Sequence, residues 1–279
     1  MLTSEDLRLI QKIHLQLGKK VDSPFSGEYR SAFRGQGMEF EDVRLYVPGD
    51  DVRRIDWNVT ARTGMTHVKE FREEREMNLM IVADVSASMR FGRRERDKRK
   101  MMAYLVGALS FAALRSGDRV GLLKFASGVE EFIPPRKGRG HAWSLIQNIF
   151  MEPAQGLTSN LDSALEHLQN FLKRKTTICI ISDFWVDATQ RLKILSHKHA
   201  VHGFLIHDPL EGGVATSGLV EVRDAESGKQ MLVDCAAFSP TKSMEQRLSS
   251  LRTDRMRVSS VSTEEDPILA LLRHFRLQG

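Results

Sequence analysis

The sequence predicts an α/β protein built on a doubly wound, mostly parallel sheet with helices on both faces. Residues 79–83 and 178–181 are apolar runs without alternation, which is typical of strands buried on both faces of a parallel sheet. Helix-length stretches alternate with these and further short apolar runs, as in successive βαβ units. We therefore expect a main domain at 77–279, preceded by an N-terminal helix and a small β-rich extension at 1–76.

The N-terminal extension begins with a predicted helix at residues 3–17, where apolar side chains recur at helical spacing. Residues 18–37 carry glycines and a proline among basic residues, so we expect an irregular segment there. The alternating stretches 43–47 and 66–71 are typical of half-buried strands. A Pro-Gly pair at 48–49 indicates a turn after the first of them.

Six strands are expected in the main domain, because short apolar runs recur between turn signals. They lie at residues 79–83, 119–125, 129–133, 176–181, 200–206 and 256–261. The third should pair with the second as an edge hairpin and end at Pro134-Pro135. A separate hairpin is predicted at 221–223 and 231–233.

Six helices are expected to alternate with these strands. They lie at residues 98–115, 141–151, 161–173, 187–197, 240–254 and 265–276. The first is apolar almost all round, so it should be buried against the sheet.

Polar oxygens follow the buried strand at 79–83. The pattern Asp84-x-Ser86-x-Ser88 sets one carboxylate and two hydroxyls at alternate positions. The end of such a strand lies at the carboxyl edge of the sheet, where open α/β sheets bind ligands. Hard oxygen donors without nitrogen or sulfur suit Mg²⁺ or Mn²⁺ better than zinc. The alternative is that Ser86 and Ser88 only cap the next turn or helix.

Two later loops complete a resemblance to the metal-ion-dependent adhesion site of the von Willebrand factor type A domain. In that family the first loop supplies Asp-x-Ser-x-Ser, the second a threonine and the third an aspartate. The resemblance implies a von Willebrand factor type A-like, Rossmann-like fold with a Mg²⁺ or Mn²⁺ site. The residues that it implies as metal ligands are Asp84, Ser86, Ser88, Thr158 or Ser159, and Asp183.

The second loop leaves its ligand open between two residues. Counting forward from Gly156 favours Thr158, whereas counting back from the Ala-Leu pair at 164–165 favours Ser159. Simple capping is the alternative for this loop, by Ser159 or Asn160 on the helix at 161–173. For the third loop, Asp183 could instead cap the helix at 187–197.

A second resemblance rests on the segment at 37–57. It contains Gly37-Met38-Glu39-Phe40, Tyr46-Val47-Pro48-Gly49-Asp50-Asp51 and Arg54-Ile55-Asp56-Trp57. Ahead of a type A core, this order resembles the bacterial domain-of-unknown-function family 58, over about residues 30–275. Two roles remain open for Asp50, Asp51 and Asp56: a structural turn paired with Arg53 and Arg54, or a partner-docking surface.

These resemblances imply a non-enzymatic, divalent-metal-dependent adaptor that works with a MoxR-type AAA+ ATPase. A vacant position on the metal would accept an Asp or Glu carboxylate from a partner protein. Phe184 and Trp185 either form an apolar rim beside the metal or pack under the following helix.

Other function classes find less support in the sequence. A P-loop pattern Gly-x₄-Gly-Lys-Ser/Thr does not occur. A metal-dependent phosphoesterase would need a general base or second metal near Asp84, and none is readable. Nucleic-acid binding would use the basic run at 93–100, but acidic residues interrupt that run and a solvated loop is the simpler interpretation. The net charge of +5, from 41 basic and 36 acidic residues, does not demand such a partner.

We expect a cytoplasmic protein that does not insert into a membrane. The two cysteines form no readable framework, which fits a reducing compartment. The first residues lack the basic start and apolar run of a signal peptide. The most apolar helical stretch, 101–114, is shorter than the ~20 residues that cross a bilayer.

Overall fold

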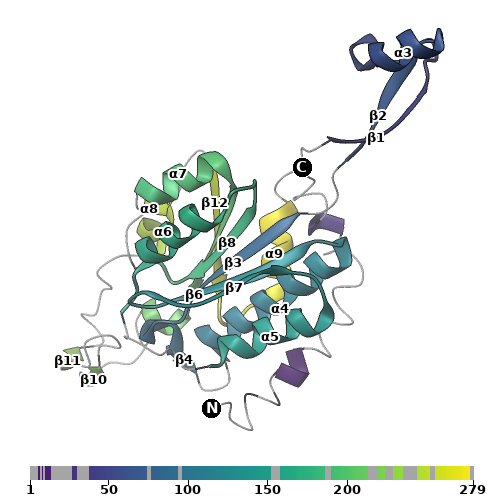
Figure 1. Ribbon diagram of the computed structural model, residues 1–279. Helices are drawn as coiled ribbons and strands as arrows, with labels where there is room; N and C mark the ends of the chain where they lie inside the picture. Colours follow the sequence, from purple (N-terminus) through teal and green to yellow (C-terminus); the bar gives the residue numbers. More distant parts are fainter. Residues whose placement is uncertain are drawn as a thin grey trace.

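The computed structural model describes residues 6, 8, 10–13, 27–29, 38–73, 77–93, 96–151, 158–185, 190–212, 219–223, 229–234, 244–251 and 255–276. Within these residues the largest sheet has the strand order β12-β9-β8-β3-β6-β7 (Figure 1). Its strands are β3 (Asn78–Asp84), β6 (Arg119–Phe125), β7 (Val129–Arg136), β8 (Thr177–Ser182), β9 (Ala200–His207) and β12 (Met256–Ser262). Only the β6–β7 pair of this sheet is antiparallel, so the prediction of a mostly parallel sheet is confirmed.

The chain builds this sheet outward from β3 in two directions. β6 and β7 follow on one side, and the chain then returns to place β8, β9 and β12 on the other. The direction of winding therefore reverses between β3 and β8. In doubly wound sheets, the carboxyl ends of the strands at such a reversal are where ligands bind.

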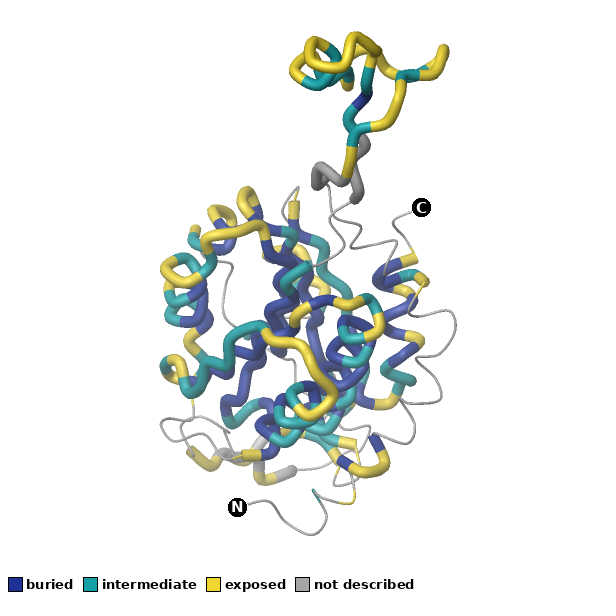
Figure 2. The backbone as a smooth tube through the Cα atoms, turned by 45° about the vertical axis from the view of Figure 1, so that its right-hand side comes forward, coloured by how far each residue is buried: buried dark blue, intermediate teal, exposed yellow. Residues whose placement is uncertain are grey.

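Helices cover both faces of the sheet (Figure 1). One layer consists of α4 (Lys98–Ser116), α5 (Arg139–Ile149) and α9 (Pro267–Arg276). The other consists of α6 (Leu161–Phe171), α7 (Gln190–Lys198) and α8 (Met244–Leu251). The strands between the layers are largely buried (Figure 2). Among the described helices, none has the length and apolar character needed to cross a membrane.

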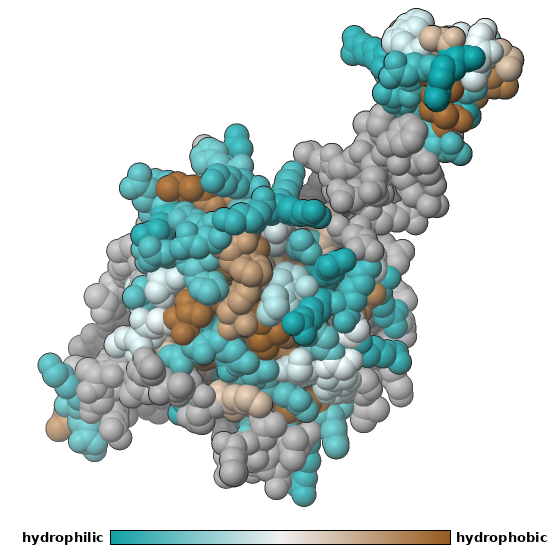
Figure 3. Space-filling model, in the orientation of Figure 1, coloured by the Kyte–Doolittle hydropathy of each residue, from teal (hydrophilic) through white to brown (hydrophobic). Residues whose placement is uncertain are grey.

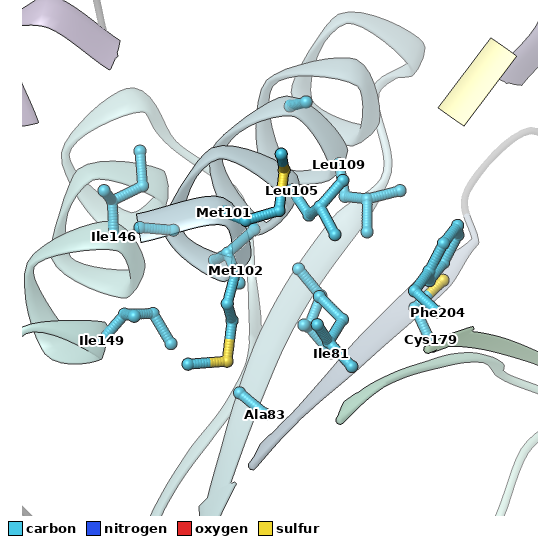
Figure 4. Close-up of a cluster of buried hydrophobic side chains, with 14 of the residues drawn as sticks. Ile81, Ala83, Met101, Met102, Leu105, Leu109, Ile146, Ile149, Cys179 and Phe204 are labelled. Atoms are coloured by element: carbon cyan, nitrogen blue, oxygen red, sulfur yellow. The ribbon is translucent and has the colours of Figure 1, made fainter. Parts of the chain in front are cut away.

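The side chains of β3 divide between the two layers, because successive residues of a strand point to opposite faces. Leu79, Ile81 and Ala83 belong to the core under α4, α5 and α9. Met80 and Val82 belong to the core under α6, α7 and α8. Figure 4 shows side chains of α4 and α5 gathered over Ile81 and Ala83. Burial on both faces explains why this strand has no alternating pattern.

α4 is buried almost all round, as its sequence predicts. Asp97 starts it, because the Asp97 carboxylate accepts a hydrogen bond of 2.7 Å from the backbone N–H of Lys100. Gly117 ends it in the left-handed conformation, at φ 79°. These limits place Lys98 in the first turn of the helix.

β7 continues to Arg136, so the prediction that Pro134-Pro135 ends it is wrong. A strand at the edge of a sheet has a neighbour on one side only, and prolines are tolerated there. The register between β6 and β7 shifts at this point. Gly121 lies opposite, and a Cβ on it would come within 2.7 Å of the Ile133 carbonyl oxygen. The missing side chain therefore allows the proline-containing strand to approach.

An antiparallel hairpin of β1 (Met38–Leu45) and β2 (His67–Glu73) stands away from the main sheet (Figures 1 and 2). Between its strands lie η1 (Val52–Arg54) and α3 (Trp57–Thr63). We call residues 38–73 the arm. The two strands overlap the stretches 43–47 and 66–71 that were expected to be strands, but α3 was not predicted.

The arm exposes apolar side chains, which appear brown and tan in Figure 3. Those more than half exposed are Leu45, Val47, Val52, Trp57 and Met65. Trp57 is 70% exposed. The expectation of a half-buried strand face at 43–47 is therefore wrong for Leu45 and Val47.

The described parts of the N-terminal segment are helical. Residues 6, 8 and 10–13 agree with the helix predicted at 3–17, and Ile10 and Ile13 are buried in the core under α4. Residues 27–29 are also helical, and Tyr29 is buried in the same core, so this part of the segment expected to be irregular is ordered. The rest of 18–37 lies outside the described residues.

Two short hairpins and two 3-10 turns complete the described elements. The predicted hairpin is present as β10 (Leu219–Arg223) with β11 (Gln230–Asp234). The others are β4 (Gly92–Arg93), β5 (Arg96–Asp97), η2 (Ala87–Arg90) and η3 (Pro209–Gly212).

Candidate metal centre

Three loops meet at the carboxyl edge of the sheet. β3 and β8 are parallel neighbours, so Asp84 at the end of β3 and Asp183 just after β8 lie at the same edge. β6 is the other neighbour of β3. The loop before α6 is fastened to the end of β6, because the Asn160 N–H donates to the Ala126 carbonyl oxygen at 2.7 Å. The sheet therefore gathers all three loops that the sequence singled out.

Asp84 is the centre of this edge. Its side chain is fully buried, and its Oδ1 accepts a hydrogen bond of 3.0 Å from the Ser86 N–H. Its Oδ2 accepts hydrogen bonds from the hydroxyls of Ser159 at 2.8 Å and Ser182 at 2.7 Å. The Oγ atoms of Ser86 and Ser88 lie 3.2 Å apart. The structure thus brings one carboxylate and four hydroxyls together.

The geometry distinguishes the two residues left open in the second loop. Ser159 reaches Asp84, whereas Thr158 is exposed. Asn160 caps α6, because its Oδ1 accepts a hydrogen bond of 3.2 Å from the Ser163 N–H. The capping alternative therefore applies to Asn160, and Ser159 is available to the site.

Capping does not account for the first loop either. Ser86 precedes η2, but its hydroxyl makes no capping hydrogen bond to that turn. Its Oγ faces the Oγ of Ser88 instead.

Asp183 is held by a buried lysine. The Asp183 side chain is 1% exposed, and its Oδ2 lies 2.7 Å from Nζ of Lys98, which is also 1% exposed. Lys98 makes a second ion pair with Glu211 of η3. Arg247 of α8 donates to the backbone oxygen of Asp183 at 2.8 Å and pairs with Glu211 at 3.1 Å. The prediction of a solvated basic loop at 93–100 is therefore wrong for Lys98.

Sequence reasoning missed Ser182, Lys98, Glu211 and Arg247. Ser182 had a signal, since it is a hydroxyl at the end of an otherwise apolar strand. Lys98 and Glu211 had none, because they are 113 positions apart in the sequence (211 − 98) and meet only in the folded chain.

The electrostatics of the edge follow from burial and from the two neighbouring acids. Burial raises the pKa of Asp84, and the charge of Asp183 raises it further. Hydrogen bonds from Ser86 and Ser182 partly oppose this rise in the pKa. A cation near Asp84 would favour its ionised form, so the environment suits a site that binds a positive charge.

The donor set fits a hard cation in part. Two carboxylates and several hydroxyls are oxygen donors of the kind that Mg²⁺ and Mn²⁺ prefer. Within the residues that the structure describes, no three His, Cys, Asp or Glu side chains gather as a metal site. Binding at this edge would therefore depend on the hydroxyls, and on Asp183 leaving Lys98.

The two aromatic residues after Asp183 have different surroundings. Phe184 is 1% exposed and belongs to the core with Leu192 and Leu195 of α7. The alternative of packing under the following helix is thus correct for Phe184, and an apolar rim is wrong. Trp185 is half-buried, and the Arg247 guanidinium lies 4.1 Å from its ring centre.

The acidic residues of the arm stabilise its own turns. Both Oδ atoms of Asp50 accept hydrogen bonds of 2.7 Å from Arg44, and these bonds lower the pKa of Asp50 to about 2. Asp51 caps η1 and Asp56 caps α3. These contacts agree with the structural alternative, in which the acidic residues stabilise turns, and Asp50 pairs with Arg44.

This chain is similar to a known protein family. The family, described as protein of unknown function DUF58, matches residues 42–249. Uncharacterized proteins of Mycobacterium bovis and Mycobacterium tuberculosis are each 32% identical to this chain over 223 residues, which cover 78% of this chain and 70% of theirs.

Two solved structures share the fold. BatB from Bacteroides thetaiotaomicron has a TM-score of 0.53 and 15% identity, over 72% of this chain and 98% of that chain. An aerotolerance-related membrane protein from Bacteroides fragilis, with multiple mutations to serines, has a TM-score of 0.52 and 13% identity, over 72% and 99%. The VWA domain of SpRpn10 matches more distantly, with a TM-score of 0.38 and 10% identity over 70% and 93%.

The strand order and the two helical layers are those of the doubly wound, mostly parallel α/β fold that the sequence predicts. With a family match that spans more than half of its length, the chain belongs to the family of proteins of unknown function DUF58.

Proposed function

We propose that this chain is a protein-interaction module that binds Mg²⁺ or Mn²⁺ at the carboxyl edge of its sheet. The observation that carries the proposal is the convergence of three loops on Asp84, with the hydroxyls of Ser159 and Ser182 bonded to its carboxylate. Asp183 follows the adjacent strand and adds a second carboxylate. Three loops that are distant in the sequence thus present two carboxylates and several hydroxyls at one edge of the sheet, which is the donor set that a hard divalent cation prefers.

The residues that would hold the ion are Asp84, Ser86, Ser88, Ser159 and Asp183. Mg²⁺ prefers six oxygen ligands and keeps part of its water shell. Two carboxylates and three neutral hydroxyls would balance its charge and leave a position for an outside oxygen. When bound, the ion would attract a carboxylate from a partner protein. The affinity would then depend on an Asp or Glu side chain of that partner.

The partner that we propose is a MoxR-type AAA+ ATPase, together with a target complex that it remodels. This part rests on the family resemblance and not on a contact in the molecule. The chain itself lacks a P-loop pattern, so the ATPase would supply the energy. The chain would recognise the target or connect it to the ATPase.

The two other function classes gain no support from the geometry. Lys98 and Lys100 of the basic run pair with acidic residues of the same chain, and Arg96 donates to the backbone oxygen of Glu264. These contacts reduce the positive charge available to nucleic acid. The uncharacterized relatives carry no indication of an enzymatic activity.

A binding experiment with Mn²⁺ tests the metal. Asp84→Asn removes the central negative charge, and we expect Mn²⁺ affinity, followed by the electron paramagnetic resonance signal of free Mn²⁺, to fall at least tenfold. The matched control is Asp208→Asn. Asp208 is also a buried carboxylate at the end of a strand, but it is held by Thr263 at 2.7 Å. Equal affinities in Asp84→Asn and the original chain would reject the site.

A second experiment tests the partner. The chain is immobilised and incubated with a purified MoxR-type ATPase, with Mg²⁺ or with EDTA. We expect retention of the ATPase to fall with EDTA and in Ser86→Ala, but not in Asp208→Asn. Retention that ignores EDTA and Ser86→Ala would mean that the metal edge is not the contact surface.

A further inference from the structure

We infer that Lys98 is a built-in competitor of the divalent ion and sets the affinity of the site. The inference rests on the proposed metal site and names the residue that regulates it. Nζ of Lys98 lies 2.7 Å from Oδ2 of Asp183, where it neutralises a carboxylate that the ion would need. In this arrangement the ammonium group balances the charge of the Asp183 carboxylate, as a bound metal ion would.

Lys98 is held in this position from several sides. As the first residue of α4 it follows the cap Asp97, so the start of the helix directs it to the carboxyl edge. Its side chain is 1% exposed, and its ammonium group lies 5.7 Å from the centre of the Phe91 ring. A buried ammonium ion is costly unless it is paired. Lys98 therefore cannot leave Asp183 unless another carboxylate is within reach.

Glu211 provides that second carboxylate. It forms an ion pair with Lys98 and lies 3.1 Å from Arg247. Arg247 is itself 3% exposed and holds the backbone oxygen of Asp183 at 2.8 Å. The two cations and the two anions Asp183 and Glu211 balance one another. The Asp84 carboxylate is the charge left over at this edge.

Two arrangements of the site follow from these contacts. In the arrangement observed, Lys98 is shared between Asp183 and Glu211. In the metal-loaded arrangement, Lys98 would keep Glu211 alone, because a divalent ion between Asp84 and Asp183 would repel an ammonium group bonded to the same carboxylate. Binding of a divalent ion therefore breaks the Lys98–Asp183 ion pair. The affinity of the site for the ion is lower than the oxygen donors alone would give.

This competition predicts that substitutions of Lys98 and of Glu211 change the Mn²⁺ affinity in opposite directions. Lys98→Met keeps an unbranched apolar side chain but removes the competing charge, and Glu211 keeps Arg247. We expect Mn²⁺ affinity to rise at least tenfold. Glu211→Gln removes the alternative anchor of Lys98, so Lys98 stays on Asp183. We expect Mn²⁺ affinity to fall at least threefold.

The experiment measures Mn²⁺ dissociation constants of the full chain and its variants by electron paramagnetic resonance, with circular dichroism to verify folding. The control is Lys124→Met. Lys124 is another buried lysine, and it pairs at 3.0 Å with Glu131 of β7 instead of with Asp183. We expect its affinity to equal that of the original chain. A rise confined to Lys98→Met together with a fall in Glu211→Gln supports the inference.

The possible failures are distinguishable. Unchanged or weaker binding in Lys98→Met, with measurable binding by the original chain, overturns the role of Lys98 but keeps the metal site. Absence of binding in both the original chain and Lys98→Met overturns both proposals. If Lys98→Met does not fold, Glu211→Gln tests the inference. Mn²⁺ binding by Glu211→Gln that equals or exceeds that of the original chain overturns the role of Lys98.

Discussion

Gly121 shows how a single residue fixes the contact between two strands. A Cβ at this position would lie 2.7 Å from the Ile133 carbonyl oxygen and 2.8 Å from the Pro135 nitrogen. Both are backbone atoms of β7, so a rotamer change cannot relieve the overlap. The close approach of a strand that contains two prolines thus depends on the absence of a side chain here.

We therefore expect Gly121→Ala to destabilise the fold by about 1–3 kcal/mol, the usual cost of overpacking a core. Urea unfolding measures the change in free energy. Gly128→Ala is the control, because a Cβ there would meet nothing within 4 Å. If the two substitutions had equal effects, the close approach at Gly121 would not matter for stability.

At the residue scale, the sequence indicated those residues of the candidate site that share a short local motif, and it missed those that only the fold brings together. Asp84, Ser86 and Ser88 share one short motif, so they could be named in advance. Whether Thr158 or Ser159 faces Asp84 depends on the turn before α6, which counting could not resolve. Lys98 looked like one cation of a basic run, because its partners Asp183 and Glu211 come from distant loops.

At the element scale, the strands and helices of the main sheet were predictable because their apolar periods are strong. The arm was harder to predict. Its helix α3 has no buried residue, so it has no apolar stripe to detect. Its boundaries are set by Asp56 at the start and by Gly64 at the end, where φ is 72°. Capping residues alone, without apolar residues at helical spacing, predict a helix poorly.

The importance of these ends gives a prediction for the arm. Asp56→Ala removes the acceptor for the N–H groups of Asn58 and Val59, and should cost the helix about 1 kcal/mol. We expect faster hydrogen exchange in α3, with an unchanged melting temperature of the main sheet. Asp56→Asn is the control, since asparagine caps equally well. Loss of stability throughout the molecule in Asp56→Ala would show that the arm and the sheet unfold together.

At the scale of the whole molecule, the candidate site joins the two helical layers. Lys98 comes from α4 on one face, and Arg247 comes from α8 on the other. They meet at Asp183 and Glu211 on the edge between the layers. These contacts therefore connect the two helical layers through one cluster of charged side chains.

Far from this edge, a second buried polar contact links the outer strands to α9. Nδ1 of His202 in β9 lies 2.9 Å from Nε2 of His274, and Nδ1 of His274 lies 2.7 Å from the Ser259 hydroxyl. Burial lowers the pKa of both imidazoles, and the nearby cation Arg257 lowers them further. The folded chain thus holds both rings neutral.

This pair gives the molecule a stability that depends on pH. Because folding lowers both pKa values below the usual 6.5, the unfolded chain takes up these protons first as the pH falls. The stability that this pair contributes is full above about pH 6.5 and declines below it, by about 1.4 kcal/mol per pH unit for each proton.

The experiment compares variants, because the raised pKa of Asp84 contributes to the pH dependence of stability with the opposite sign. His202→Gln keeps an amide that can donate to or accept from His274 but cannot titrate. Urea unfolding between pH 7 and about pH 4.5 should therefore show a shallower decline in stability than in the original chain. Parallel pH profiles for His202→Gln and the original chain would mean that this buried pair does not control stability.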